Sequence, residues 1–111
     1  MTTHTASQLT REDVAPLLDD KTWYLKVGDA EIVFYHAEGR SLAKWPDGKV
    51  RQGGRILNSD GSYNMAWSDT PGQITGSRLV GTPQFFTIID VATGQPRGSV
   101  DRIVAGNPEG L

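Results

Sequence analysis

Apolar residues occur in short runs from Thr22 onward, and each run ends in a cluster of turn-forming residues. These clusters recur about every 8 to 12 residues, a spacing typical of strands joined by tight turns. The turn clusters are Gly28-Asp29, Glu38-Gly39, Pro46-Asp47-Gly48, Asn58-Ser59-Asp60-Gly61, Thr70-Pro71-Gly72, Thr82-Pro83 and Thr93-Gly94-Gln95-Pro96. The pattern predicts an all-β antiparallel meander of about seven or eight strands that closes as a barrel or a sandwich.

Alternation within the runs indicates which side of each strand is buried, because successive side chains of a strand point to opposite faces. Trp23, Leu25 and Val27 share one face, and Tyr24 and Lys26 lie on the other. We expect the core to be built from the apolar faces of the strands. Its expected members are Trp23, Leu25, Phe34, Tyr63, Met65, Trp67, Phe85 and Ile89.

One short helix is expected, between Thr10 and Leu18. Thr10 is a suitable N-cap because Asp13 follows three residues later. Pro16 is unfavourable deep inside a helix, so a start at Asp13, which places the proline in the first turn, is the alternative. Such a helix is able to plug one end of a barrel or to cover an edge strand.

Composition and charge restrict the classes of protein. The 111 residues suit one domain, which we place at residues 10–111 after a flexible N-terminus at residues 1–9. The formal charge is −2 and no basic stripe is present, so we expect no nucleic-acid partner. No segment has the length and apolarity of a membrane span, and the first residues do not resemble a signal peptide. We therefore expect no membrane partner and a cytoplasmic protein, or a periplasmic one if a leader has been removed.

Metal and cofactor chemistry has little support in the sequence. There is no cysteine, and the two histidines, His4 and His36, are not part of a ligand cluster. No phosphate-binding loop or dinucleotide motif is present, so no metal and no cofactor is expected. His36 lies at the end of an expected strand, where it is either a structural residue or a general acid or base, because imidazole titrates near neutral pH.

Aromatic and polar residues supply the candidates for a site. Trp23, Trp45 and Trp67 lie on three different expected strands, where they pack in the core or face a ligand. Arg55 and Asp69 are expected at the same end of one hairpin, either as a salt bridge at the rim or as an inward pair that orients a carboxylate. The expected ring around one barrel mouth consists of Tyr24, Tyr35, His36, Arg55, Trp67 and Asp69.

Several segments together resemble a group of small proteobacterial lipocalin-like proteins of unknown function. The segments are Lys21-Thr22-Trp23, Phe34 to Arg40, Gly54-Arg55, Tyr63 to Trp67, the turn from Asp90 to Gly94, and Val104 to Leu111. Members of that group typically have Gly-x-Trp in the fourth strand and often have cysteines, whereas this chain has Gly54-Arg55-Ile56 and no cysteine. The resemblance implies a small antiparallel lipocalin/calycin-like barrel with one short N-terminal helix.

A second, local resemblance connects Gly54-Arg55 and the stretch from Tyr63 to Gly72 with the phenolic acid decarboxylases, which are cofactor-free lipocalin-like barrels. That family has Gly-Arg-Trp and Tyr-x-x-x-Trp-Thr-Glu-Pro-Thr-Gly at these places. The resemblance implies that Arg55 holds an acidic substrate, that Asp69 replaces the family's Glu, and that Tyr24 matches one of its two first-strand tyrosines. The second tyrosine has no counterpart here.

Three functions follow from these observations. The first is a carrier or sensor that binds a small, partly apolar and acidic molecule inside the barrel, as a monomer or a homodimer. The alternative is a cofactor-free lyase or isomerase acting on a small carboxylic or phenolic acid, with Asp69, His36 or a tyrosine as acid or base. The third is a protein-interaction module whose interior is filled and which pairs through an edge strand. A cavity, and the ionisable groups that face it, would discriminate among them.

Overall fold

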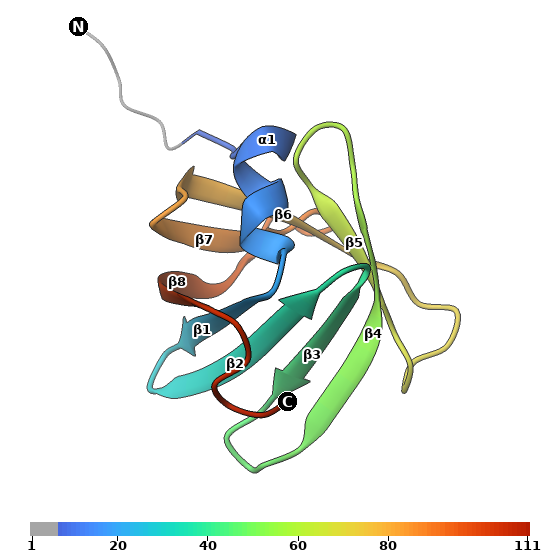
Figure 1. Cartoon of the computed structure of the whole chain (residues 1–111). Coiled ribbons are helices and arrows are strands. Elements are labelled where there is room, and N and C mark those ends of the chain that lie inside the picture. The colour runs from blue at the N-terminus through green and yellow to red at the C-terminus, as the bar shows by residue number, and fades with distance from the viewer. Residues whose placement is uncertain (1–6) are drawn as a thin grey trace, which may run out of the picture.

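The computed structural model describes residues 7–111, which form one short helical segment followed by eight strands. The elements are α1 (Arg11–Val14), η1 (Ala15–Leu18), β1 (Lys21–Val27), β2 (Ala30–Ala37), β3 (Arg40–Lys44), β4 (Val50–Leu57), β5 (Tyr63–Trp67), β6 (Thr75–Thr82), β7 (Phe85–Asp90) and β8 (Pro96–Ala105). Each strand pairs antiparallel with the next, and β8 pairs with β1, so the sheet closes on itself (Figure 1). The predicted all-β antiparallel barrel with one short helix is confirmed.

The helical segment covers one end of the barrel, beside the tip of the β4–β5 hairpin (Figure 1). Thr10 caps α1, because its hydroxyl accepts from the Asp13 amide while the Asp13 carboxylate accepts from the Thr10 amide, each at 3.2 Å. The start at Thr10 is therefore confirmed, and the chain tightens into the 3-10 turn η1 where Pro16 lies. Trp23 ties this segment to β1 by donating from Nε1 to the Leu17 carbonyl at 2.8 Å.

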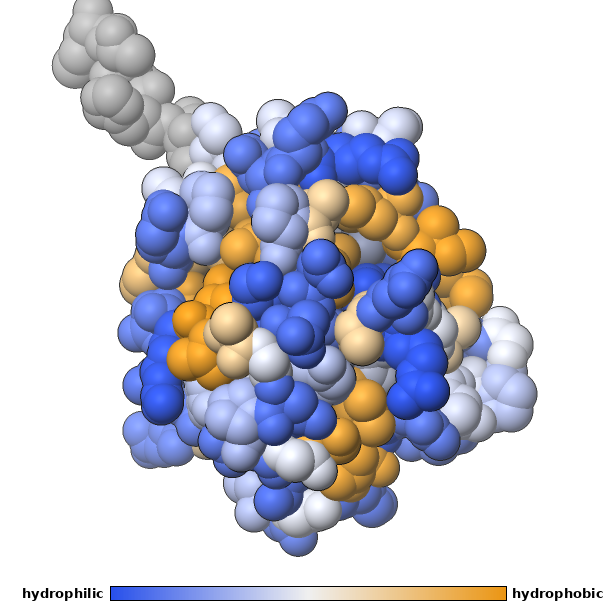
Figure 2. Space-filling model, viewed as in Figure 1, coloured by the Kyte–Doolittle hydropathy of each residue, from blue (hydrophilic) through white to orange (hydrophobic). Residues whose placement is uncertain are grey.

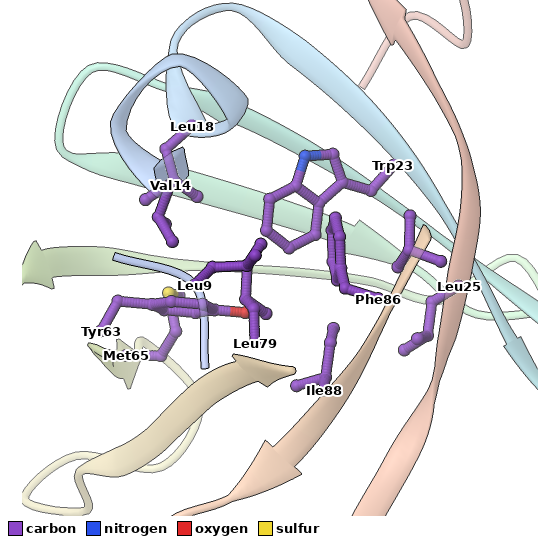
Figure 3. Packing of buried hydrophobic residues seen from close by; sticks show 11 residues of the cluster. Leu9, Val14, Leu18, Trp23, Leu25, Tyr63, Met65, Leu79, Phe86 and Ile88 are labelled. Atoms are coloured by element: carbon purple, nitrogen blue, oxygen red, sulfur yellow. The ribbon is translucent and has the colours of Figure 1, made fainter. Parts of the chain in front are cut away.

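The core fills the half of the barrel beneath this helical segment. Figure 3 shows Trp23 and Phe86 side by side, between Val14 and Leu18 of the helical segment and the strand residue Leu25. The rings of Trp23 and Phe86 meet edge to face with centroids 5.0 Å apart, and both side chains are fully buried. The buried cluster consists of Leu9, Val14, Leu18, Trp23, Leu25, Tyr63, Met65, Leu79, Phe86, Ile88 and Val100.

The predicted inward face is correct on β1 and β5 and reversed on β7. Phe86 and Ile88 are buried there, whereas Phe85 is 56% exposed and Ile89 is only partly buried. Two adjacent apolar pairs give this strand two apolar faces, so alternation alone does not identify the inner one. Phe34 and Trp67, also expected in the core, are partly buried and pack against its edge.

Residues 7–9 are not the flexible N-terminus that the sequence suggested. Gln8 forms a bridge with Val80 of β6, and the Leu9 amide donates to the Leu79 carbonyl at 2.8 Å. Leu9 is buried because it covers the core beside α1. The rest of that predicted segment, residues 1–6 with His4, lies outside the described residues.

The outer surface is a mosaic of hydrophilic side chains and separate apolar patches on the face drawn in Figure 2. Among residues 7–111, no helix has the length and apolarity needed to cross a membrane.

Candidate functional site

A cavity of about 440 Å³ occupies the end of the barrel opposite the helical segment. Its apolar walls are formed by Leu25, Val27, Ile32, Phe34, Trp45, Met65, Trp67 and Ile88. Its polar groups belong to His36, Arg51, Tyr63, Thr70, Gln73, Thr75, Ser77 and Arg97. Space remains here because the strands place small residues such as Ala43, Gly53 and Ser77 on the inner face, where large side chains would fill a barrel of this size.

Arg51 and Asp69 form the ion pair at the mouth of the cavity. Arg51 donates from Nε and Nη2 to both carboxylate oxygens of Asp69 at 2.8–3.1 Å. Its guanidinium carbon lies 4.7 Å from the centre of the Trp67 ring and 5.6 Å from that of Trp45. The hydrogen bonds from Arg51 hold the pKa of the Asp69 carboxyl below its usual value.

The sequence predicted Arg55, and not Arg51, as the partner of Asp69, because it placed the start of that strand at Arg55. The strand β4 begins at Val50, and Gly53 and Gly54 lie inside it. Gly53 pairs with Trp67, and a Cβ at Gly53 would lie 2.4 Å from the Ala66 carbonyl oxygen, so a glycine permits the strands to approach closely. This register places Arg55 opposite Met65, about 13 Å along the strand from Arg51.

Arg55 instead closes the opposite end of the barrel. It donates to the carbonyls of Leu18, Ala37 and Arg40 at 3.2, 2.7 and 2.6 Å, and to the Ser41 hydroxyl at 2.7 Å. It makes no ion pair with a carboxylate of residues 7–111. Burial lowers the pKa of its guanidinium, which nevertheless stays protonated. The side chain therefore joins the end of η1 to the turn between β2 and β3.

His36 lies between Arg55 and the cavity. Its side chain is 1% exposed, and Nδ1 lies 2.6 Å from the Ser41 hydroxyl oxygen and 3.4 Å from Nη1 of Arg55. Its other ring nitrogen, Nε2, is buried without a hydrogen-bond partner in the described part of the chain. Burial, with a further contribution from Arg55, lowers the pKa of His36 well below its usual value of 6.5.

Tyr24 and Tyr35 lie on the outer face of the barrel and not at its mouth. Tyr24 donates from its hydroxyl to Glu109 at 2.8 Å and stacks under the guanidinium of Arg102, 4.2 Å from the ring centre. Tyr35 donates to Asp20. The alternation of β1 already places Tyr24 opposite to Trp23, so the expected ring of six residues at one mouth does not form.

The three tryptophans divide between core and cavity. Trp23 is fully buried in the core and does not line the cavity, whereas Trp45 and Trp67 are partly buried at its mouth. The residues that were expected at the site are thus separated into three groups. His36 and Arg55 lie together at the closed end, Trp45, Trp67 and Asp69 lie at the mouth, and Trp23, Tyr24 and Tyr35 lie outside the cavity.

Of the polar residues of the cavity, the sequence indicated only His36 as a site residue, and Arg97 and the hydroxyl of Tyr63 are among those that it missed. Burial raises the pKa of Tyr63 to about 12, so its hydroxyl stays protonated. Arg97 donates to the Ser77 hydroxyl and pairs with Asp90 at 3.0 Å. Tyr63 was detectable by its inward alternation, but the pairing of β8 shifts register against both neighbours, so alternation does not reveal the direction of Arg97.

Because His36 is buried and neutral, we expect the free energy of unfolding to depend on pH. In the unfolded chain this imidazole binds a proton near pH 6.5, whereas the folded protein keeps it neutral, so folding loses stability as the pH falls below that value. From pH 7 to pH 5 we expect this group to lower the free energy of unfolding by at most roughly 2 kcal/mol.

Urea unfolding at several pH values, on the natural protein and on His36→Phe, measures this contribution. The aspartates with lowered pKa values lose their contribution at more acidic pH, and they are present in both proteins. The free energy of unfolding should fall more steeply toward pH 5 in the natural protein than in His36→Phe. Parallel pH dependence of the two proteins would mean that folding does not change the pKa of His36.

Within residues 7–111, no cluster of His, Cys, Asp and Glu side chains has the arrangement needed to hold a metal ion. Comparisons of the chain with protein-family models, with curated proteins and with solved structures find no match.

Proposed function

We propose that this barrel binds a small, largely apolar and acidic molecule in its cavity, as a carrier or sensor. The observation that supports this most directly is the cavity itself, about 440 Å³ with apolar walls and a few polar groups. That combination is typical of small-molecule sites, where apolar contacts supply affinity and a few polar groups fix the orientation.

The distribution of charge favours an acidic ligand. The two arginines that line the cavity, Arg51 and Arg97, are each paired with a carboxylate. Arg55 has no such partner and lies directly behind His36 at the closed end. Asp19 and Glu38 adjoin Arg55 only around a separate hollow on the exterior, where solvent screens charges. Within the barrel, the field of Arg55 therefore favours the electron-rich end of a ligand.

The arrangement supports binding over acid–base catalysis. Asp69 is held at the mouth by Arg51, at the far end of β4 from Arg55. The pKa of His36 is lowered and that of Tyr63 is raised, so neither group is poised to exchange a proton near neutral pH. The open interior and the closed barrel likewise favour a binding protein over a module that pairs through a free edge strand.

Filling the cavity tests the proposal. Thr75 lines the cavity, and Thr75→Trp should occupy a large part of it. In calorimetric titrations with naphthoate, an aromatic carboxylate, we expect this variant to lose at least tenfold in affinity, which is about 1.4 kcal/mol.

The matched control is Thr87→Trp, the same substitution on the outer face of β7, where Thr87 lies beside Ser99. This variant should bind naphthoate as the natural protein does. Equal affinity in all three proteins, or no binding to any of them, would contradict a ligand site in the cavity.

A further inference from the structure

We propose that His36 offers a fixed Nε2–H donor at the inner end of the cavity. The ligand then binds with an acceptor oxygen, of a carboxylate or a carbonyl, at its buried end. This inference rests on the proposed function and specifies the chemistry of the ligand's buried end. It follows from the contacts of the two ring nitrogens of His36.

The contacts at Nδ1 determine the tautomer. Arg55 donates to the Ser41 hydroxyl oxygen at 2.7 Å, because a guanidinium has no acceptor atom. The Ser41 oxygen is therefore the acceptor of this bond, and the hydroxyl proton is available for a different acceptor. The Ser41 hydroxyl lies 2.6 Å from Nδ1. The charged Nη1 of Arg55, whose two protons go to the Arg40 carbonyl and the Ser41 hydroxyl, lies 3.4 Å from Nδ1. A hydroxyl donor and a positive charge beside Nδ1 both favour a lone pair on this nitrogen, so the imidazole proton resides on Nε2.

Aromatic neighbours hold the ring in this orientation. The Trp23 ring meets His36 edge to face with centroids 4.2 Å apart, and the Phe34 ring stacks nearly parallel to it at 5.8 Å. Both partners are large, and Trp23 lies on the neighbouring strand β1 while Phe34 lies two residues before His36 on β2. A rotation of the imidazole would break the hydrogen bond between Nδ1 and the Ser41 hydroxyl.

The Nε2–H group is the one part of this arrangement that has no partner. It is buried, it belongs to a residue that lines the cavity, and no group of residues 7–111 accepts from it. A buried polar group without a hydrogen bond is costly, and in native proteins such a group calls for an explanation, of which a bound partner is one. An acceptor oxygen that reaches Nε2 by displacing the side chains that cover it completes the network, and the positive charge of Arg55 behind the ring strengthens the donor.

The first experiment reads the tautomer without any ligand. Long-range nitrogen–proton correlation NMR of the natural protein should show a protonated Nε2 and an unprotonated Nδ1 for His36. Addition of naphthoate should then shift the Nε2–H signal in a saturable way. A proton on Nδ1, or an Nε2–H signal that does not move while naphthoate binds, overturns the inference and leaves the proposed function intact.

The second experiment compares three probes that share an apolar body: the carboxylate naphthoate, the ketone acetonaphthone and the hydrocarbon ethylnaphthalene. Both oxygen-bearing probes should bind more tightly than the hydrocarbon, about five- to tenfold, which is the usual value of one hydrogen bond. A preference for naphthoate over acetonaphthone assigns the natural ligand to acids, and equal affinity assigns it to carbonyl compounds.

His36→Phe removes the donor and keeps a planar ring, so it should reduce the affinity for the two oxygen-bearing probes to that of the hydrocarbon. Tyr35→Phe introduces the same side chain at the adjacent residue on the outer face, and it should change nothing. Equal affinity of all three probes for the natural protein overturns the inference alone. Failure of every probe to bind overturns the proposed function as well.

Discussion

Replacing Trp23 with alanine should lower the free energy of unfolding by about 3–5 kcal/mol, a large part of the ~5–15 kcal/mol typical of a small domain. The indole is fully buried and contacts both Phe86 and His36. Its Nε1 also satisfies the Leu17 carbonyl at the end of the helical segment. The variant therefore loses apolar contacts, opens a cavity and leaves a carbonyl without its donor.

Trp67→Ala is the matched control, because Trp67 is also a strand tryptophan but faces the cavity and is only partly buried. Trp67→Ala should lower the free energy of unfolding by less than half as much as Trp23→Ala does. Urea unfolding followed by far-UV circular dichroism measures both losses. Equal losses would mean that Trp67 belongs to the packed core and that the cavity closes around it in solution.

Arg55→Ala should also destabilise the protein by roughly 3–5 kcal/mol, because several part-buried acceptors lose a charged hydrogen-bond donor at once. Three carbonyls, those of Leu18, Ala37 and Arg40, lose a charged donor at once. The Ser41 hydroxyl loses its donor as well. The large loss assigns Arg55 a structural role at the closed end.

Arg51→Ala provides the comparison, since Arg51 lies on the same inner face of β4 and makes an ion pair at the exposed mouth. Exposed pairs contribute little, so this variant should be far more stable than Arg55→Ala. Urea unfolding of both variants measures the two free energies of unfolding for this comparison. Similar losses from the two arginines would contradict the assignment of Arg55 to the buried end.

The fold was predictable because turn residues and alternation act locally. The spacing of the glycine, proline and asparagine clusters defined the hairpins, and Thr10 with Asp13 defined the start of α1. The errors arose where a strand is apolar on both faces, as at Phe85 and Phe86, or where a strand was expected to begin too late, as at Arg55 in β4. In both cases the register of neighbouring strands, which the sequence does not reveal, determines the outcome.

The site was less predictable because it depends on which residues face each other across strands. One hairpin register separates Arg55 from Asp69 and pairs the latter with Arg51. The relay from Arg55 through Ser41 to His36 connects β4, β3 and β2, and no spacing along the chain indicates it. Alternation did place His36 and Trp67 on inner faces, and both line the cavity.

The central claim is that a small molecule occupies the barrel interior, and Met65 tests it most directly. The chain has two methionines, and Met65 is buried and lines the cavity. In protein labelled at the methionine methyl groups, Met65→Leu identifies the Met65 signal by its disappearance. Titration with naphthoate should shift that signal in a saturable way, because an aromatic ring placed in the cavity lies against it. Binding of naphthoate with no movement of the Met65 signal would contradict the account.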